Sequence, residues 1–230
     1  MTQLRALIFD FDGVIADTEP LHFSGLQKTL REVGIDLTEP DYFANYLGYD
    51  DRGCFLAALT AHGRPIDPVT LRQLMERKAA AYLESVKDHS VIFPGVAELV
   101  REAAARHPLA IASGALRHEI EYILEQAGLR KEFSHITSAE DVTRGKPDPQ
   151  PFLLAMEALR RSHDPTLAAD SCLVIEDSLP GIRGAKAAGM KVLAVANTHS
   201  LQDLHEADAT APHLKQVRLS ELQARLWPSR

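Results

Sequence analysis

Short apolar runs alternate with amphipathic stretches over most of the chain. The runs that predict buried β-strands lie at Ala6–Phe11, Leu109–Ser113, His135–Ser138, Cys172–Ile175 and Val192–Val195. Between them, helical periodicity predicts helices at about Gly95–Arg106, His118–Ala127, Pro151–Arg161 and Pro180–Ala188. This alternation is typical of βαβ units around a parallel sheet. The expected fold class is therefore α/β, with a Rossmann-like parallel sheet core flanked by helices.

One long segment interrupts this order. Between residues 18 and 88 no apolar run favours a strand, and the periodicity predicts helices at Leu21–Val33, Asp41–Tyr46, Asp51–His62 and Pro68–Val86. An all-helical insert after the first strand predicts a separate subdomain. We expect an α/β core of residues 1–17 and 89–230 and a helical cap domain of residues 18–88. The two adjacent linkers would form a hinge.

Composition and charge narrow the class of protein. A chain of 230 residues that is 45% hydrophobic can bury a full core. A formal net charge of -7 without a run of Lys or Arg disfavours nucleic acid as a partner. The first residues lack a secretory signal pattern, and no apolar run reaches membrane-spanning length. Cys54 and Cys172 each lie in an apolar stretch, which favours two buried thiols over a disulfide. We expect a cytoplasmic protein that is a monomer or a weak homo-oligomer.

Polar residues follow the predicted strands at the points where ligands bind in an open parallel sheet. They are Asp10-Phe11-Asp12-Gly13, Ser113-Gly114-Ala115, Gly145-Lys146-Pro147-Asp148-Pro149 and Glu176-Asp177-Ser178. Taken singly, each has an ordinary interpretation as a helix cap, a turn or a solvated lysine. Asp10 and Asp12 are two residues apart, so on an extended chain they project to the same side. The same alternation that predicts the parallel sheet brings these segments to one edge, and together they predict a single site.

In order and spacing, Asp10-Phe11-Asp12-Gly13-Val14, Ser113, Lys146 and Glu176-Asp177 resemble the four motifs of the haloacid dehalogenase superfamily of phosphotransferases. The helical insert is similar to the cap of the β-phosphoglucomutase and phosphoglycolate phosphatase branch. Asp12 argues against the dehalogenase members, which lack the second aspartate. The resemblance implies a hydrolase of phosphoric monoesters that acts on a small phosphorylated metabolite, such as a sugar phosphate or a phosphoglycolate-like acid.

The resemblance also implies a role for each catalytic residue. Asp10 would be the nucleophile that forms an aspartyl-phosphate, and Asp12 would be the general acid and base. The Ser113 hydroxyl and the Gly114 amide would donate hydrogen bonds to the phosphoryl oxygens. Lys146 would place a positive charge between those oxygens and the Asp10 carboxylate.

A divalent cation is expected because two nearby carboxylates repel an anionic substrate unless a positive charge offsets them. Magnesium prefers oxygen ligands. By the resemblance, Asp10, the backbone carbonyl of Asp12 and the Asp177 carboxylate would bind Mg2+. Glu176 would either bind the ion directly or contact one of its ligands without binding the ion itself.

Substrate specificity is expected in the cap. By position, His22, Arg52 and Lys78 resemble the cap residues that face the site in the mutase branch. Surface positions remain an alternative for Arg52 and Lys78.

Two other functions compete with the phosphatase interpretation. Sugar phosphate mutases of this branch share a Ser-Ala-Ser-Lys run after the second strand, whereas this chain has Ser113-Gly114-Ala115-Leu116. The missing Ser and Lys favour a phosphatase, although Arg117 or His118 could replace those contacts. The third interpretation, a non-catalytic binding domain, is disfavoured because no motif position is substituted.

Overall fold

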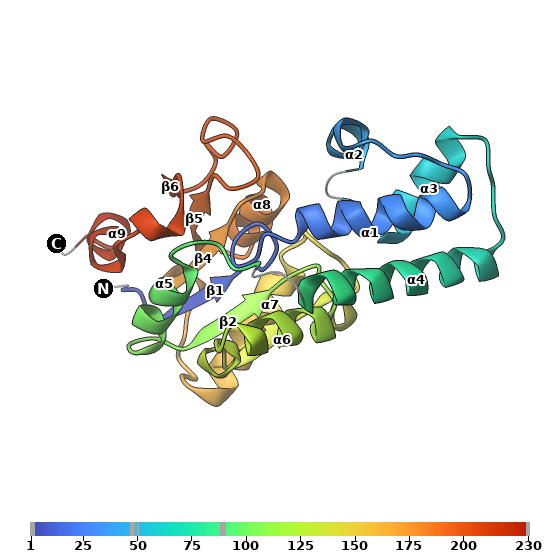
Figure 1. The fold of residues 1–230 in the computed structure, drawn as a ribbon. Coiled ribbons are helices and arrows are strands. Elements are labelled where there is room, and N and C mark those ends of the chain that lie inside the picture. Colours follow the sequence, from blue (N-terminus) through green and yellow to red (C-terminus); the bar gives the residue numbers. More distant parts are fainter. Residues whose placement is uncertain (1–2, 47–48, 50, 88–90, 229–230) are drawn as a thin grey trace. The chain divides into compact units, whose positions relative to one another are not determined.

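The computed structural model describes residues 3–46, 49, 51–87 and 91–228. By its internal contacts the chain divides into two compact units, which are coloured along the sequence in Figure 1. One unit comprises Met1–Asp17 with Val91–Arg230, and the other comprises Thr18–Ser90.

The first unit is built on a parallel sheet in the order β3-β2-β1-β4-β5-β6. The strands are β1 (Ala6–Phe9), β2 (Leu109–Ala112), β3 (His135–Thr137), β4 (Cys172–Glu176), β5 (Lys191–Val195) and β6 (Ala209–Ala211). The first five coincide with the predicted strands to within two residues at either end, and the predicted α/β fold class is confirmed. The sixth strand was not predicted, because a three-residue Ala-Thr-Ala segment has no apolar run to mark it.

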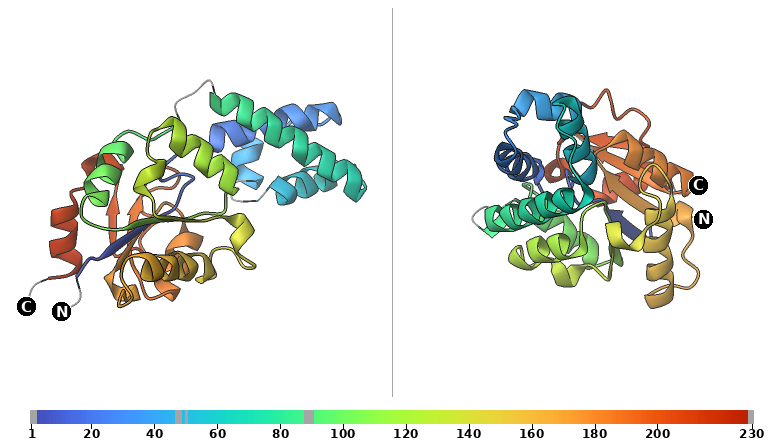
Figure 2. Two further views of the ribbon diagram at one scale, coloured as in Figure 1. Left: turned by 90° about the horizontal axis from the view of Figure 1, so that it is seen from below. Right: turned by 90° about the vertical axis from the view of Figure 1, so that its right-hand side faces the viewer.

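Helices cover both faces of this sheet, with α5 and α6 on one side and α7 and α8 on the other (Figure 2). The helices of this unit are α5 (Val96–Ala104), α6 (Arg117–Gln126), α7 (Gln150–Ser162), α8 (Leu179–Ala187) and α9 (Leu219–Leu226). The α7 and α8 face buries Phe152 and Ile182 against strand residues such as Val174. Burial of an apolar side chain of this size stabilises a fold by about 1.5–3 kcal/mol, so this layer anchors the strand ends that carry polar residues.

The regular elements among the described residues of the second unit are all helices: α1 (Glu19–Glu32), α2 (Glu39–Asn45), α3 (Asp51–Ala61) and α4 (Pro68–Lys87). Local sequence sets the start of α2, where the Thr38 hydroxyl accepts a hydrogen bond from the Asp41 N–H at 3.3 Å. The unit has its own apolar core, which includes Leu30, Phe55 and Leu74. An apolar core of its own is a property of a separate domain.

Both cysteines are buried and neither forms a disulfide among the described residues, which confirms the prediction of two buried thiols for Cys54 and Cys172. Burial, the largest effect, raises the pKa of the Cys172 thiol to about 12. That thiol is therefore protonated and unreactive at neutral pH. Among the described residues, no helix is long and apolar enough to cross a lipid bilayer.

Candidate active site

Asp10 leaves the sheet directly after β1 while its backbone is still paired with β4. Its N–H donates to the carbonyl oxygen of Ile175 at 2.9 Å. The chain then turns sharply at Gly13, whose φ is +75°. A Cβ atom at this position would lie 1.9 Å from Asp177 Oδ2, so only glycine permits the approach of the two loops. The turn thus brings the loop after β1 against the loop after β4.

Lys146 lies between two of the carboxylates. Its Nζ is 2.7 Å from Asp10 Oδ1 and 2.7 Å from Glu176 Oε1. The lysine side chain is only 14% exposed, so both ion pairs are shielded from solvent. A lysine in a solvated loop would have no such partners. The interpretation of Lys146 as a solvated surface lysine is therefore wrong.

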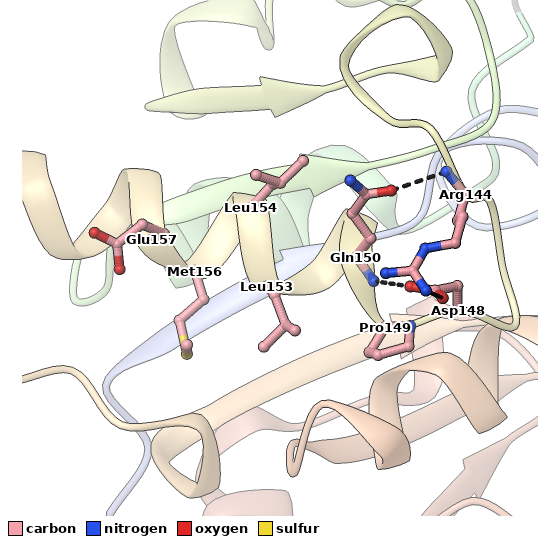
Figure 3. A pocket seen from close by; sticks show the side chains of 8 residues that line it. All are labelled: Arg144, Asp148, Pro149, Gln150, Leu153, Leu154, Met156 and Glu157. Atoms are coloured by element: carbon pink, nitrogen blue, oxygen red, sulfur yellow. Dashed lines mark hydrogen bonds and ion pairs between the residues drawn. The ribbon is translucent and has the colours of Figure 1, made fainter.

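Side-chain contacts fix the loop that carries Lys146, as Figure 3 shows. Gln150 Oε1 accepts the N–H of Arg144 at 2.8 Å, and the Gln150 N–H donates to Asp148 Oδ1 at 2.9 Å. Arg144 and Asp148 also form an ion pair of 3.2 Å. The pocket of about 410 Å³ in the figure is lined by residues between 144 and 157. Asp148 and Pro149 of the Lys146 segment line it, but none of the predicted catalytic, metal-binding or substrate-binding residues does.

Glu176 is fully buried, and protein donors engage both of its oxygens. Oε1 is paired with Lys146. Oε2 accepts the N–H groups of Asp177 and Ser178, each at 2.8 Å, and the Ser178 hydroxyl at 2.9 Å. A Cβ on Gly181 would lie 1.6 Å from Oε1, so this side chain has no room to turn. This geometry suits a residue that orients Lys146 and the start of α8.

Asp10, Glu176 and Asp177 form a buried acidic cluster in which one oxygen of each lies within 4.8 Å of the others. Burial, the largest effect, raises the pKa of Asp10 to about 7, while Lys146 opposes the shift and Glu176 adds to it. Burial, and then Glu176 and Asp10, raise the pKa of Asp177 well above its usual value. Burial alone would lower the pKa of Lys146, but the two carboxylates beside it raise it.

Three buried carboxyl groups thus lie together beside one lysine side chain among the described residues. A set of closely spaced carboxylate oxygens is the donor type that hard divalent cations prefer. The residues present therefore fit a divalent metal ion, with Asp10 and Asp177 as the candidate side-chain ligands.

The remaining core positions lie at the same edge of the sheet. Ser113 follows β2 and is buried, and its Oγ accepts the N–H of Ala115 at 3.0 Å. Gly114 is exposed, and a Cβ there would meet no atom of the described chain within 4 Å. Asp12 is half-buried in the turn after β1, where its charge contributes to raising the pKa of both Asp10 and Asp177. The phosphoryl and proton-transfer roles of these residues stay predictions.

In the helical unit, two of the three predicted substrate residues lie together. Lys78 is buried, and its Nζ is 2.6 Å from His22 Nδ1 and 2.6 Å from Asp51 Oδ1. The His22 ring also stacks on Tyr82, with ring centroids 4.5 Å apart. Burial, followed by the charge of Lys78, lowers the pKa of His22 well below its usual value, so the ring is neutral. Arg52 is exposed in the first turn of α3.

Sequence reasoning missed a fifth polar segment at the site. Asn197 and Thr198 follow β5, and they donate to the Gly13 carbonyl oxygen and to Asp177 Oδ2 respectively. The rule that placed the other residues, inspection of each strand end, applies equally to β5 and would have found them. Arg117, a possible substitute for a mutase contact, instead donates to the Ile136 carbonyl oxygen at 2.9 Å and pairs with Asp141 at 2.5 Å.

This sheet order, with an acidic cluster and one lysine at the carboxyl ends of the central strands, defines a class of enzyme. The chain belongs to the haloacid dehalogenase-like hydrolase family, whose sequence model matches residues 7–195. Protein CbbY of Cupriavidus necator is 32% identical over 230 residues, covering 92% of this chain and 86% of that protein. The phosphorylated carbohydrates phosphatase of Thermotoga maritima is 30% identical over 222 residues, covering 90% and 93%.

Among solved structures, β-phosphoglucomutase from Clostridium difficile superposes with a TM-score of 0.83. It covers 97% of each chain at 22% identity, which supports the fold. Within the family, the chain is a phosphatase of the β-phosphoglucomutase and phosphoglycolate phosphatase-like branch, a hydrolase acting on phosphoric monoesters. The expected family and enzyme class are thereby confirmed.

Proposed function

We propose that this protein is a magnesium-dependent phosphatase of a small phosphorylated metabolite, a sugar phosphate or a phosphoglycolate-like acid, and that it acts through an aspartyl-phosphate on Asp10. The observation that carries the proposal is the position of the Asp10 carboxylate, buried at the end of β1 and 2.7 Å from the Lys146 ammonium. The name of the Thermotoga maritima relative, a phosphatase of phosphorylated carbohydrates, supports this substrate class.

In the first step an oxygen of the Asp10 carboxylate attacks phosphorus. The new O–P bond forms as the ester P–O bond breaks, and Asp12 gives its proton to the departing alkoxide. Lys146 holds Asp10 Oδ1, which leaves Oδ2 as the attacking oxygen. The Ser113 hydroxyl and the Gly114 N–H donate to the phosphoryl oxygens.

In the second step Asp12, now a carboxylate, takes a proton from water as the water oxygen attacks the same phosphorus. The bond between phosphorus and Asp10 breaks, inorganic phosphate leaves, and both aspartates return to their starting protonation states. Asp12 therefore serves as an acid in one step and as a base in the next.

The metal site consists of Asp10, the backbone carbonyl of Asp12 and Asp177. Bound magnesium would supply positive charge that offsets the carboxylates and the phosphoryl oxygens. Glu176 holds Lys146 in place rather than binding the ion, because protein donors engage both of its oxygens.

The helical unit, residues 18–88 by our domain boundaries, is proposed to act as the cap that selects the substrate. Burial, and then the charge of Lys78, lower the pKa of His22 and keep its ring neutral. With the Lys78 ammonium donating to Nδ1, the proton of this ring is on Nε2 and is available to a substrate oxygen. Arg52, an exposed residue, is proposed to contact a distal anionic group of the substrate.

A panel of phosphate esters tests this function. The purified protein, assayed with magnesium, is expected to release phosphate from several sugar phosphates without a bisphosphate activator. Asp10→Asn is the control, and it is expected to release none. Strict dependence on a bisphosphate with little free phosphate would identify a mutase instead. Metal binding without turnover of any ester would identify a non-catalytic binding domain.

A further inference from the structure

The loop after β5 contacts two segments of the acidic cluster with three consecutive side chains. Asn197 Nδ2 donates to the Gly13 carbonyl oxygen at 2.8 Å. Thr198 Oγ1 donates to Asp177 Oδ2. His199 Nδ1 lies 3.1 Å from the backbone oxygen of Asp177. One loop thereby connects the turn that follows Asp12 with the candidate metal ligand Asp177.

The direction of these contacts is defined by their neighbours. His213 Nδ1 lies 3.3 Å from Asn197 Oδ1, which fits an amide whose oxygen accepts from His213 and whose nitrogen faces Gly13. Asp177 Oδ2 lies so close to Gly13 that any Cβ there would overlap it. The Thr198 hydroxyl and Gly13 therefore set the rotation of the Asp177 carboxylate, which leaves Oδ1 to bind a cation.

Such support has a physical reason. Three buried carboxylates with oxygens within 4.8 Å of one another repel, and Asp177 has no ion pair with Lys146 among the contacts of the described chain. A carboxylate that must be ready to bind a metal needs a donor that holds one oxygen and neutralises no charge. A hydroxyl group meets both requirements.

We propose that Thr198 and Asn197 are positioning residues of the divalent-metal site. Thr198 orients the Asp177 carboxylate, and Asn197 fixes the backbone beside the Asp12 carbonyl. The inference rests on the proposed metal-dependent function. It assigns to the loop after β5 a role in metal affinity, separate from the chemistry carried by Asp10 and Asp12.

The test is direct titration of the purified, metal-free protein with Mn2+, followed by electron paramagnetic resonance, together with the magnesium dependence of turnover. Thr198→Val keeps the shape of the side chain but loses the hydroxyl, and Thr198→Ser restores the hydroxyl. Loss of a residue that orients a metal ligand typically weakens metal binding by about 10- to 100-fold. We expect that change in Kd for Thr198→Val, near wild-type affinity for Thr198→Ser, and kcat at saturating magnesium within a few-fold of wild type.

Ser200→Ala is the matched control, because its hydroxyl donates to the Asp203 carboxylate at 2.6 Å on the exposed part of the same loop. Wild-type affinity for Mn2+ in Thr198→Val would overturn the inference, even if the metal-free variant melted at a lower temperature. If Thr198→Val does not fold, the same Mn2+ titration is done with Asn197→Asp, which replaces the donor to Gly13 by an acceptor. Weaker Mn2+ binding would support the inference, and wild-type affinity would overturn it. A wild-type protein that binds Mn2+ but hydrolyses no ester contradicts only the proposed function.

Discussion

Replacement of Lys146 by methionine tests the charge balance of the site, because it removes the ammonium group while keeping much of the side-chain volume. At 2.7 Å from each partner, Lys146 interacts with Asp10 and with Glu176. Each interaction is about 6 kcal/mol at an effective dielectric constant of about 20, before the cost of desolvation. Removing one partner of such a buried pair typically costs about 3–5 kcal/mol of stability, so we expect a lower melting temperature.

The effect on activity follows from the pKa of Asp10. Burial raises this pKa to about 7 in the metal-free protein, so part of the Asp10 population is protonated at neutral pH. Without Lys146 the pKa of Asp10 rises further. Each additional pKa unit lowers the fraction of Asp10 that is ionised, and therefore nucleophilic, by about tenfold. We therefore expect kcat/KM at pH 7 to fall at least tenfold at limiting magnesium, with the acid limb of its pH profile shifted upward.

The assay is the pH dependence of kcat/KM for a sugar phosphate at several magnesium concentrations. Lys186→Met is the matched control, since Lys186 pairs with Asp208 on the exposed side of α8. The argument that Lys146 lowers the pKa of Asp10 would be refuted if the acid limb of the Lys146→Met profile lay at the same pH as in wild type. Unchanged turnover at neutral pH would refute it as well.

Three further predictions concern the acidic residues. Asp12→Asn should reduce steady-state turnover of alkyl phosphates by about 10² to 10⁴-fold. With an activated aryl phosphate, the first step, measured by burst kinetics, should slow less. Equal losses with both substrates would exclude the acid role of Asp12. Asp177→Asn should raise the magnesium concentration for half-maximal activity more than Glu176→Gln does, and the reverse order would make Glu176 the ligand. Burial raises the pKa of Asp10 and Asp177, so the folded metal-free protein binds protons more tightly than the unfolded chain. Its stability should therefore fall as pH rises from about 4 to about 7. Thermal unfolding in the presence of a chelator measures this loss of stability. Asp10→Asn should make the loss smaller, and added magnesium should restore the stability.

The sequence pattern was sufficient for most of the fold, because buried parallel strands such as Cys172–Glu176 are continuous apolar runs. It did not reveal β6 or α9, which are short elements of three and eight residues. The rule that ligands bind at the carboxyl ends of parallel strands was sufficient to place Asp10 and Asp177 at one edge of the sheet.

Finer features of the site needed the structure. The sequence does not tell which of two adjacent acids meets the lysine, because that depends on the direction of each side chain at the end of β4. In the structure Glu176 pairs with Lys146, while Asp177 accepts from Thr198. The pairing of Lys78 with Asp51 was equally hidden, since these residues lie on different helices of the insert.

The central claim, that Asp10 carries the phosphoryl group, is tested most directly by trapping the intermediate. Asp12→Asn protein, mixed with an aryl phosphate and quenched in acid, is examined by intact mass and by peptide mapping. The account predicts a mass gain of one phosphoryl group, located on the peptide that contains Asp10 and absent when Asp10 is also replaced by Asn. A phosphoryl group on any other residue, or turnover that persists in Asp10→Asn, would contradict it.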